Sequence, residues 1–180
     1  MTDAVLGAVT LYVTLHSARG PLFRCAAALF SVAALLGVLR FSGLYADENP
    51  HMIVSMIAGV AAFPALTVSV MVPDSPIARK WRVSSVFLLL LATVGLSIVI
   101  YSGSRLYLNA CALLAMAGIA YVSLRARRWV DVVSAVTMLV GLLCFAVKLS
   151  PITPLQPADV LHLALAVGWL GLDRSRSAAL

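Results

Sequence analysis

Several long stretches of this chain contain no charged side chain, and this feature restricts its fold more than any other. Four of them are Cys25–Leu39, Met52–Pro73, Val83–Ser104 and Leu106–Leu124, and Val132–Val147 is similar. A helix that crosses a bilayer needs about 20 consecutive apolar residues, with a usual range of about 17–25. The chain as a whole is 62% hydrophobic and only 11% charged, whereas ordinary soluble domains are about 45–50% apolar and about 25% charged. We therefore predict one all-α integral membrane domain over residues 1–180.

Seven apolar segments are candidates for membrane-spanning helices. They are Asp3–Ala18, Pro21–Tyr45, Pro50–Val72, Trp81–Ser102, Arg105–Leu124, Trp129–Leu149 and Ala158–Asp173. The first and last are the shortest, at about 16 residues, which span only about 24 Å at a rise of about 1.5 Å per residue. Pro21 and Pro50 stand at segment starts, where a missing N–H costs nothing. Pro64 lies inside the third segment and is expected to kink it.

The Lys and Arg residues divide unequally between the two sides that seven crossings would create. Arg40, Arg105 and Lys148 fall on one side. Ten fall on the other side: Arg19, Arg24, Arg79, Lys80, Arg82, Arg125, Arg127, Arg128, Arg174 and Arg176. Because cytoplasmic loops carry the excess of basic residues, we predict an outside N-terminus and a cytoplasmic C-terminus. The alanine- and arginine-rich composition favours a multi-pass protein of a bacterial inner (plasma) membrane.

The same distribution excludes several other classes of protein. Basic residues in short clusters between apolar runs flank a membrane and do not form a nucleic-acid-binding face. Three cysteines without CxxC spacing favour neither a disulfide framework nor a structural zinc site. The chain begins Met1-Thr2-Asp3 and enters apolar sequence without a basic region, so we expect the first segment to be retained and not removed as a signal peptide. The predicted partners are the lipid bilayer and other membrane-protein subunits.

Ionisable residues at membrane depth are the best indicators of a site, because burying them is costly. His51 begins the third segment, Asp159 and His162 lie one turn apart near the start of the seventh, and Asp3 begins the first. By the predicted topology all four lie near the outer face. His51, Asp159 and His162 together form a candidate metal site, since two imidazoles and a carboxylate are a ligand set typical of catalytic zinc. The alternative is that Asp159 only favours a helix start and that the histidines only contact lipid headgroups.

Seven segments, an acidic residue opening the first, a histidine near the second connection and another early in the last segment together resemble the ceramidase and progestin-receptor-like superfamily. The resemblance implies a zinc-dependent amide hydrolase acting on lipids, with Asp3, Ser42, His51 and His162 at the matching positions. The family's last helix carries an HxxxH pair, whereas here Ala166 follows His162 by four residues. The run from Gln156 to Leu163, which contains Asp159 and His162, is also similar to an Asp-Leu-x-His signature that closes some uncharacterised bacterial membrane proteins.

Three functions from different classes remain open at this point. The first is a non-enzymatic subunit or scaffold of a membrane assembly, which has no cofactor and is favoured by short loops and little buried charge. The second is a zinc-dependent lipid-amide hydrolase built on His51, Asp159 and His162. The third is a small solute transporter or channel, for which Asn109 and Lys148 are the main candidates for an intramembrane polar path.

Overall fold

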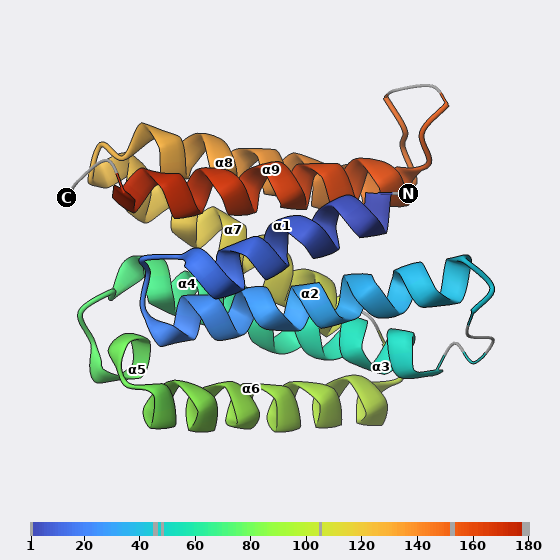
Figure 1. Ribbon diagram of the computed structural model, residues 1–180, viewed down its shortest axis with the longest axis horizontal. Coiled ribbons are helices and arrows are strands. Elements are labelled where there is room, and N and C mark those ends of the chain that lie inside the picture. The colour runs from blue at the N-terminus through green and yellow to red at the C-terminus, as the bar shows by residue number, and fades with distance from the viewer. Residues whose placement is uncertain (1, 45–46, 48, 105, 152–153, 178–180) are drawn as a thin grey trace.

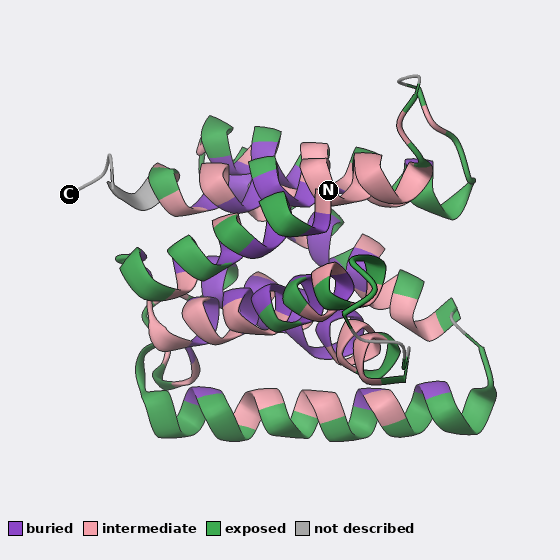
Figure 2. Ribbon diagram, turned by 45° about the vertical axis from the view of Figure 1, so that its right-hand side comes forward, coloured by how far each residue is buried: buried purple, intermediate pink, exposed green. Residues whose placement is uncertain are grey.

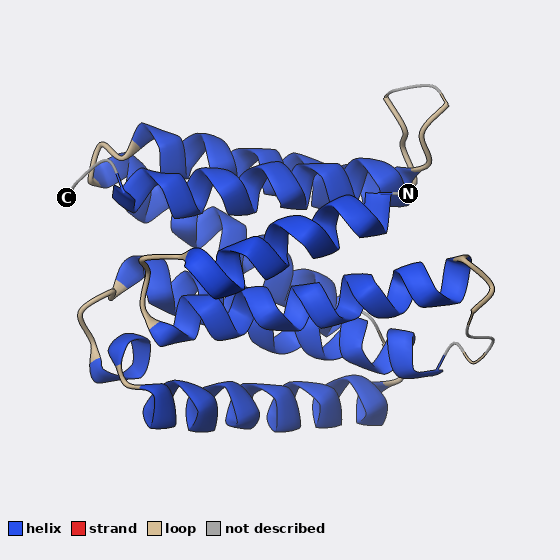
Figure 3. Ribbon diagram, in the orientation of Figure 1, coloured by secondary structure: helices blue, strands red, loops and turns tan. Residues whose placement is uncertain are grey.

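A computed structural model shows a bundle of helices in which no described residue forms a β-strand (Figure 3). The structure describes all residues except 1, 45–46, 48, 105, 152–153 and 178–180. Its helices are α1 Thr2–His16, α2 Pro21–Phe41, α3 Asn49–Ile57, the π-helical turn η1 Ala58–Ala62, α4 Phe63–Met71, α5 Pro76–Arg79, α6 Trp81–Ser102, α7 Leu106–Arg125, α8 Trp129–Ala146 and α9 Pro157–Ser177. The all-α class predicted from the sequence is confirmed.

The predicted segments correspond to these helices, with α3, η1 and α4 together forming the third. Two predicted limits, Tyr45 and Arg105, lie outside the described residues. The sixth segment ends at Ala146, three residues before the predicted Leu149, because Lys148 adopts a left-handed backbone (φ 55°) that ends the helix. The seventh continues past the predicted Asp173 to Ser177, since no glycine or proline interrupts that stretch. The short helix α5 was not predicted.

The expected effect of Pro64 on the third segment appears as the π-helical turn. Proline has no N–H to donate to the carbonyl one turn earlier, and its ring crowds that carbonyl. The helix therefore departs from regular α geometry over Ala58–Ala62, directly before the proline, and resumes as α4. Every residue of η1 is buried, so this irregular turn lies inside the bundle.

Among the residues that the structure describes, five helical segments are long and apolar enough to cross a membrane. They are α2, the continuous stretch Asn49–Met71, α6, α7 and α8. The two flanking helices are not among them: α1 has only 15 residues, and α9 carries Asp159, Asp173 and Arg174 near its two ends. Length and composition thus establish a protein with several helices suited to a membrane.

The helices run roughly along one direction in two groups (Figure 1). Helices α8 and α9 lie side by side, and α1 contacts both α9 and α2. The centre is aromatic: Trp169 on α9 is fully buried and packs edge-on against Phe23 and Phe30 of α2, and Phe30 meets Phe63 of α4. Helix α6 lies at the margin with only Ser84, Gly95 and Val99 buried (Figure 2). Its exposed leucines, valines and isoleucines suit contact with lipid.

Candidate functional site

The beginnings of α1, α3 and α9 lie at the same end of the bundle (Figure 1), and each carries residues of the predicted site. Asp3 on α1 lies beside His162 on α9, with Oδ1 3.4 Å from Nδ1 of the imidazole. Thr2 is 3.4 Å from the same ring nitrogen and donates its hydroxyl to Asp159 Oδ1 at 2.5 Å. The first and last helices thus meet through polar side chains that are more than 150 residues apart in the sequence.

His51 joins this group from α3. Its Nδ1 donates to the carbonyl oxygen of Ala33 on α2 at 3.1 Å, because a carbonyl can only accept, and this leaves Nε2 with its lone pair. A Cβ atom added to Gly37 would lie 2.8 Å from Asp3 Oδ1 and 3.1 Å from His51 Cε1. The absence of a side chain at Gly37 therefore lets the Asp3 carboxylate and the His51 ring approach the same point on α2. We call Asp3, His51, Asp159 and His162 the Asp–His cluster.

Within the cluster the carboxylate that contacts His162 is Asp3. Asp159 accepts the Thr2 hydroxyl with Oδ1 and the backbone N–H of Gln156 with Oδ2, an arrangement typical of a residue that stabilises a helix start. The sequence prediction grouped His51, Asp159 and His162. The structure adds Asp3, which lies beside His162 and approaches the same point on α2 as the His51 ring.

The fit of this cluster to zinc can be judged from its distances. The 3.4 Å between Asp3 Oδ1 and His162 Nδ1 exceeds an ordinary N–H···O bond of about 2.7–3.2 Å. It is close to the distance of about 3.3–3.4 Å expected between two ligand atoms of a tetrahedral zinc ion when each ligand atom lies about 2.0–2.1 Å from the metal. The part of the chain that the structure describes holds no group of three or more His, Cys, Asp or Glu already placed around one metal position. Zinc binding would therefore require the side chains of Asp3, His51 and His162 to move closer together.

The other residues singled out in the sequence lie apart from the cluster. Ser42 is exposed at the end of α2 and bonds to the carbonyl of Leu39. His16 lies at the far end of α1, stacked on Tyr12. Asn109 and Lys148 are both exposed, so neither lies on a path through the interior.

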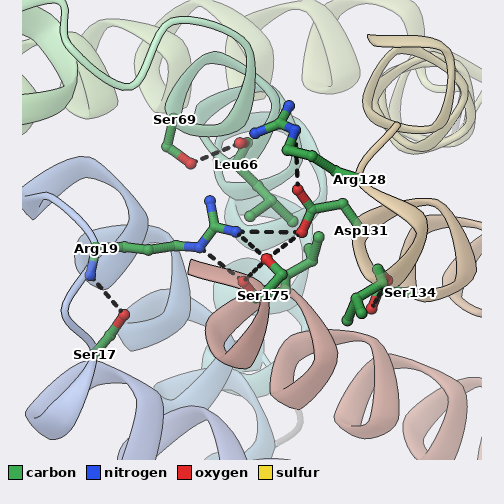
Figure 4. A network of polar contacts seen from close by, with 10 residues as sticks. Ser17, Arg19, Leu66, Ser69, Arg128, Asp131, Ser134 and Ser175 are labelled. Carbon is green, nitrogen blue, oxygen red and sulfur yellow. Dashed lines mark hydrogen bonds and ion pairs between the residues drawn. The ribbon is translucent and has the colours of Figure 1, made fainter. Parts of the chain in front are cut away.

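A second polar group, which was not predicted from the sequence, lies at the opposite end of the bundle, where α1 and α9 end and α8 begins. Figure 4 shows its contacts. Arg19, in the connection between α1 and α2, is 5% exposed and reaches across to α8 and α9. Its Nη2 lies 3.3 Å from Asp131 Oδ1 and 2.8 Å from Ser175 Oγ, and its Nε donates to the carbonyl of Leu172 at 2.8 Å. Ser175 also donates to Asp131. We call Arg19, Asp131 and Ser175 the Arg19–Asp131 network.

This network corrects the expectation of little buried charge. Asp131 is fully buried, and Arg128 Nε lies 3.5 Å from its second oxygen, Oδ2. A buried carboxylate is costly unless it is paired and hydrogen-bonded, and here two guanidinium groups and a hydroxyl surround it. The sequence signal for this network was Asp131 itself, which is the only acidic residue in the segment Trp129–Leu149. Its place in the first turn of α8 looks like an ordinary interaction with the helix dipole, so the sequence alone did not distinguish it.

The comparison with known protein families gives one match, which covers almost the whole chain. Residues 1–177 match the family described as "Family of unknown function (DUF6962)", and the chain belongs to that family. No curated protein and no solved structure matches the chain.

Proposed function

We propose that this member of the DUF6962 family is a seven-span protein of a bacterial inner membrane that serves as a non-enzymatic subunit or scaffold of a membrane assembly. The observation that carries the proposal is the use of interior polar groups. Arg19 and Asp131 join the α1–α2 connection to α8 and α9, and Ser31 on α2 lies within hydrogen-bonding distance of the Gly7 carbonyl on α1. These groups fix helices to one another and do not line an interior space.

The surface supports the same proposal. The two best-defined hollows among the described residues measure about 120 and 320 Å³, and neither is lined by a residue of the Asp–His cluster. An enzyme site is normally a concave pocket with converging polar groups. A bundle in which the Asp–His cluster and the Arg19–Asp131 network join helices near the two ends of α1 is better suited to holding a fixed shape for other subunits.

The positions of α1 and α9 support the proposal of seven crossings. Both lie in the bundle beside helices that can span, α1 against α2 and α9 against α8. In a membrane such flanking helices cross beside their partners, and the polar ends of α9 reach the two interfaces. The excess of Lys and Arg on one side favours an outside N-terminus and a cytoplasmic C-terminus.

Affinity purification of the tagged protein from its native membrane tests the scaffold proposal. We expect stable co-purification of other membrane proteins, with His162→Ala behaving like the wild type. Gly59→Leu should lose the partners, because even a Cβ atom at Gly59 would lie 2.6 Å from Leu108 Cγ and push α7 away. Gly118→Ala is the control, since the nearest atom to its Cβ would be 3.6 Å away. A wild-type protein that purifies alone would contradict the proposal.

The Asp–His cluster favours a second candidate, a zinc-dependent hydrolase of lipid amides. Asp3, His51 and His162 would hold the ion. Zinc in such a site lowers the pKa of a bound water to about 7 and makes it a nucleophile. The proximity of Asp3 to both imidazoles supports this candidate, and the hydrogen bond from His51 Nδ1 to Ala33 resembles the outer contacts that orient zinc ligands.

Elemental analysis of the purified protein separates the two candidates. The hydrolase requires near-stoichiometric zinc that His162→Ala removes. Gly37→Ala should weaken zinc binding as well, because its Cβ would crowd Asp3 and His51. His16→Ala, at the far end of α1, is the control and should retain the metal. Equal zinc content in the wild type and in His162→Ala would exclude the hydrolase.

A further inference from the structure

The larger of the two hollows described above is a groove of about 320 Å³ between α8 and α9, which we call the α8–α9 groove. Its lining includes Trp129, Val130, Val133 and Thr137 of α8, and Val167 and Gly171 of α9. Trp129, Val130, Val133 and Val167 are all more than half exposed. Each wall of the groove thus presents large apolar side chains outward.

At the floor of the groove the two helices approach each other closely. A Cβ atom on Gly171 would lie 2.1 Å from Ser134 Oγ and 3.3 Å from Ser134 Cβ, so a larger residue at position 171 would force Ser134 to move. The hydroxyls of Ser134 and Thr137 donate to carbonyls of their own helix, Val130 and Val133, at 2.7 and 2.8 Å. Because these hydroxyls are satisfied, the groove offers its occupant an almost wholly apolar wall.

Exposed positive charge lies near the end of the groove at which α8 begins. Arg127 precedes the lining residue Trp129 by two positions and is exposed. On α9, Val167, Gly171 and Arg174 follow one another at spacings of four and three, which places them on one face of the helix. Arg174 is exposed one turn beyond the groove. Tryptophan at this boundary is typical of the membrane–water interface.

We propose that the α8–α9 groove binds an anionic phospholipid, with an acyl chain against its apolar walls and the phosphate near Arg127 and Arg174. Basic pockets between membrane helices bind anionic headgroups in this way. Positive charge at the interfacial end of an apolar groove matches an anionic headgroup above an acyl chain, and this favours a lipid over a second copy of the chain or a partner helix. The inference rests on the membrane placement proposed above, and it is independent of whether the protein is a scaffold.

Fluorescence quenching tests the lipid site in vesicles in which the purified full-length chain is the only protein. In a Trp81→Phe background, Trp129 is the exposed tryptophan, since Trp169 is fully buried. Brominated phosphatidylglycerol and brominated phosphatidylcholine are compared as quenchers in mixed vesicles. We expect phosphatidylglycerol to quench Trp129 at a lower mole fraction. Arg174→Gln should reduce this preference about fivefold, the effect expected for one basic residue near an anionic headgroup.

Matched variants complete the experiment. Arg82→Gln removes an exposed arginine at the start of α6, away from the groove, and should leave the preference unchanged. Val167→Phe should fill the groove and reduce quenching by both lipids, whereas Val140→Phe, on exposed α8 surface outside the lining, should not. Equal quenching by the two lipids, or equal losses in Arg174→Gln and Arg82→Gln, would overturn the proposal. If quenching decreases as the protein-to-lipid ratio rises and is the same for both headgroups, the groove is occupied by a second copy of the chain. That result would also overturn the proposal.

Discussion

Asp131 shows at the scale of one residue how a charge can be kept inside an apolar bundle. Its side chain is 1% exposed and that of Arg19 is 3% exposed. The carboxylate contacts two guanidinium groups and the Ser175 hydroxyl, so its negative charge is compensated. Oδ1 accepts hydrogen bonds, whereas Oδ2 forms only the 3.5 Å ion pair with Arg128 Nε. Removing one partner of such a pair leaves an unbalanced buried charge, which costs far more than the pair itself contributes.

We expect Asp131→Asn to lower the free energy of unfolding by about 3–5 kcal/mol, the cost typical of breaking a buried pair from one side. Reversible unfolding of the purified protein in detergent micelles measures this change. Asp74→Asn is the matched control, because its ion pair with Arg79 is more than half exposed on both sides and should contribute about 0–1 kcal/mol.

The double variant Arg19→Met with Asp131→Leu should cost less than either single change, because apolar residues can replace a buried pair at little cost when both charges are removed together. Similar losses for Asp131→Asn and Asp74→Asn would show that the network contributes nothing beyond an exposed pair.

At the scale of the helix, α8 and α9 are joined by close backbone approach at glycine positions. A Cβ atom on Gly141 would lie 2.5 Å from the Ala164 Cβ, which cannot rotate away. Glycine at such contacts lets membrane helices pack by van der Waals contact. The contact between α8 and α9 therefore depends on small residues. The sequence contains these residues but does not indicate which residue of the other helix each one contacts.

Gly141→Ala should force α8 and α9 apart and lower stability by about 1–3 kcal/mol, as overpacking of an interior does. Thermal unfolding in detergent would detect the loss. Gly7→Ala serves as the control, because its Cβ would meet the Ala34 Cβ at an ordinary 3.5 Å. Equal melting temperatures for the wild type and Gly141→Ala would contradict the close contact.

At the scale of the whole molecule, two groups of polar side chains join helices to one another, one at each end of the bundle. The Asp–His cluster joins the starts of α1, α3 and α9, and the Arg19–Asp131 network joins the α1–α2 connection to the start of α8 and the end of α9. Helix α9 takes part in both, whereas α1 takes part in the first and is followed by Arg19 of the second. The first and last helices of the bundle are thus fixed to their neighbours near both ends.

Reporter fusions test this orientation. A reporter after the C-terminus should be active only in the cytoplasm, and a reporter after Asn49 only outside, because the basic residues concentrate on the side that carries the C-terminus. Cytoplasmic activity of the Asn49 fusion would reverse the orientation and place His51 at the inner face.

Local sequence patterns were sufficient to predict the helices. Charge-free runs, prolines at segment starts and the distortion before Pro64 depend on residues close together in the chain, so the sequence by itself determined the all-helical class, most helix limits and the membrane-suited character. The seven crossings and their orientation stay predictions.

Only the tertiary structure decided which polar residues meet. Asp3, not Asp159, approaches His162, and Arg19 finds Asp131 over a separation of 112 residues. Such contacts depend on how each helix is rotated and on which helix lies beside it, and those are set by packing at positions such as Gly37 and Gly171. A single glycine in a sequence does not name the side chain that will lie against it, because that neighbour belongs to another helix.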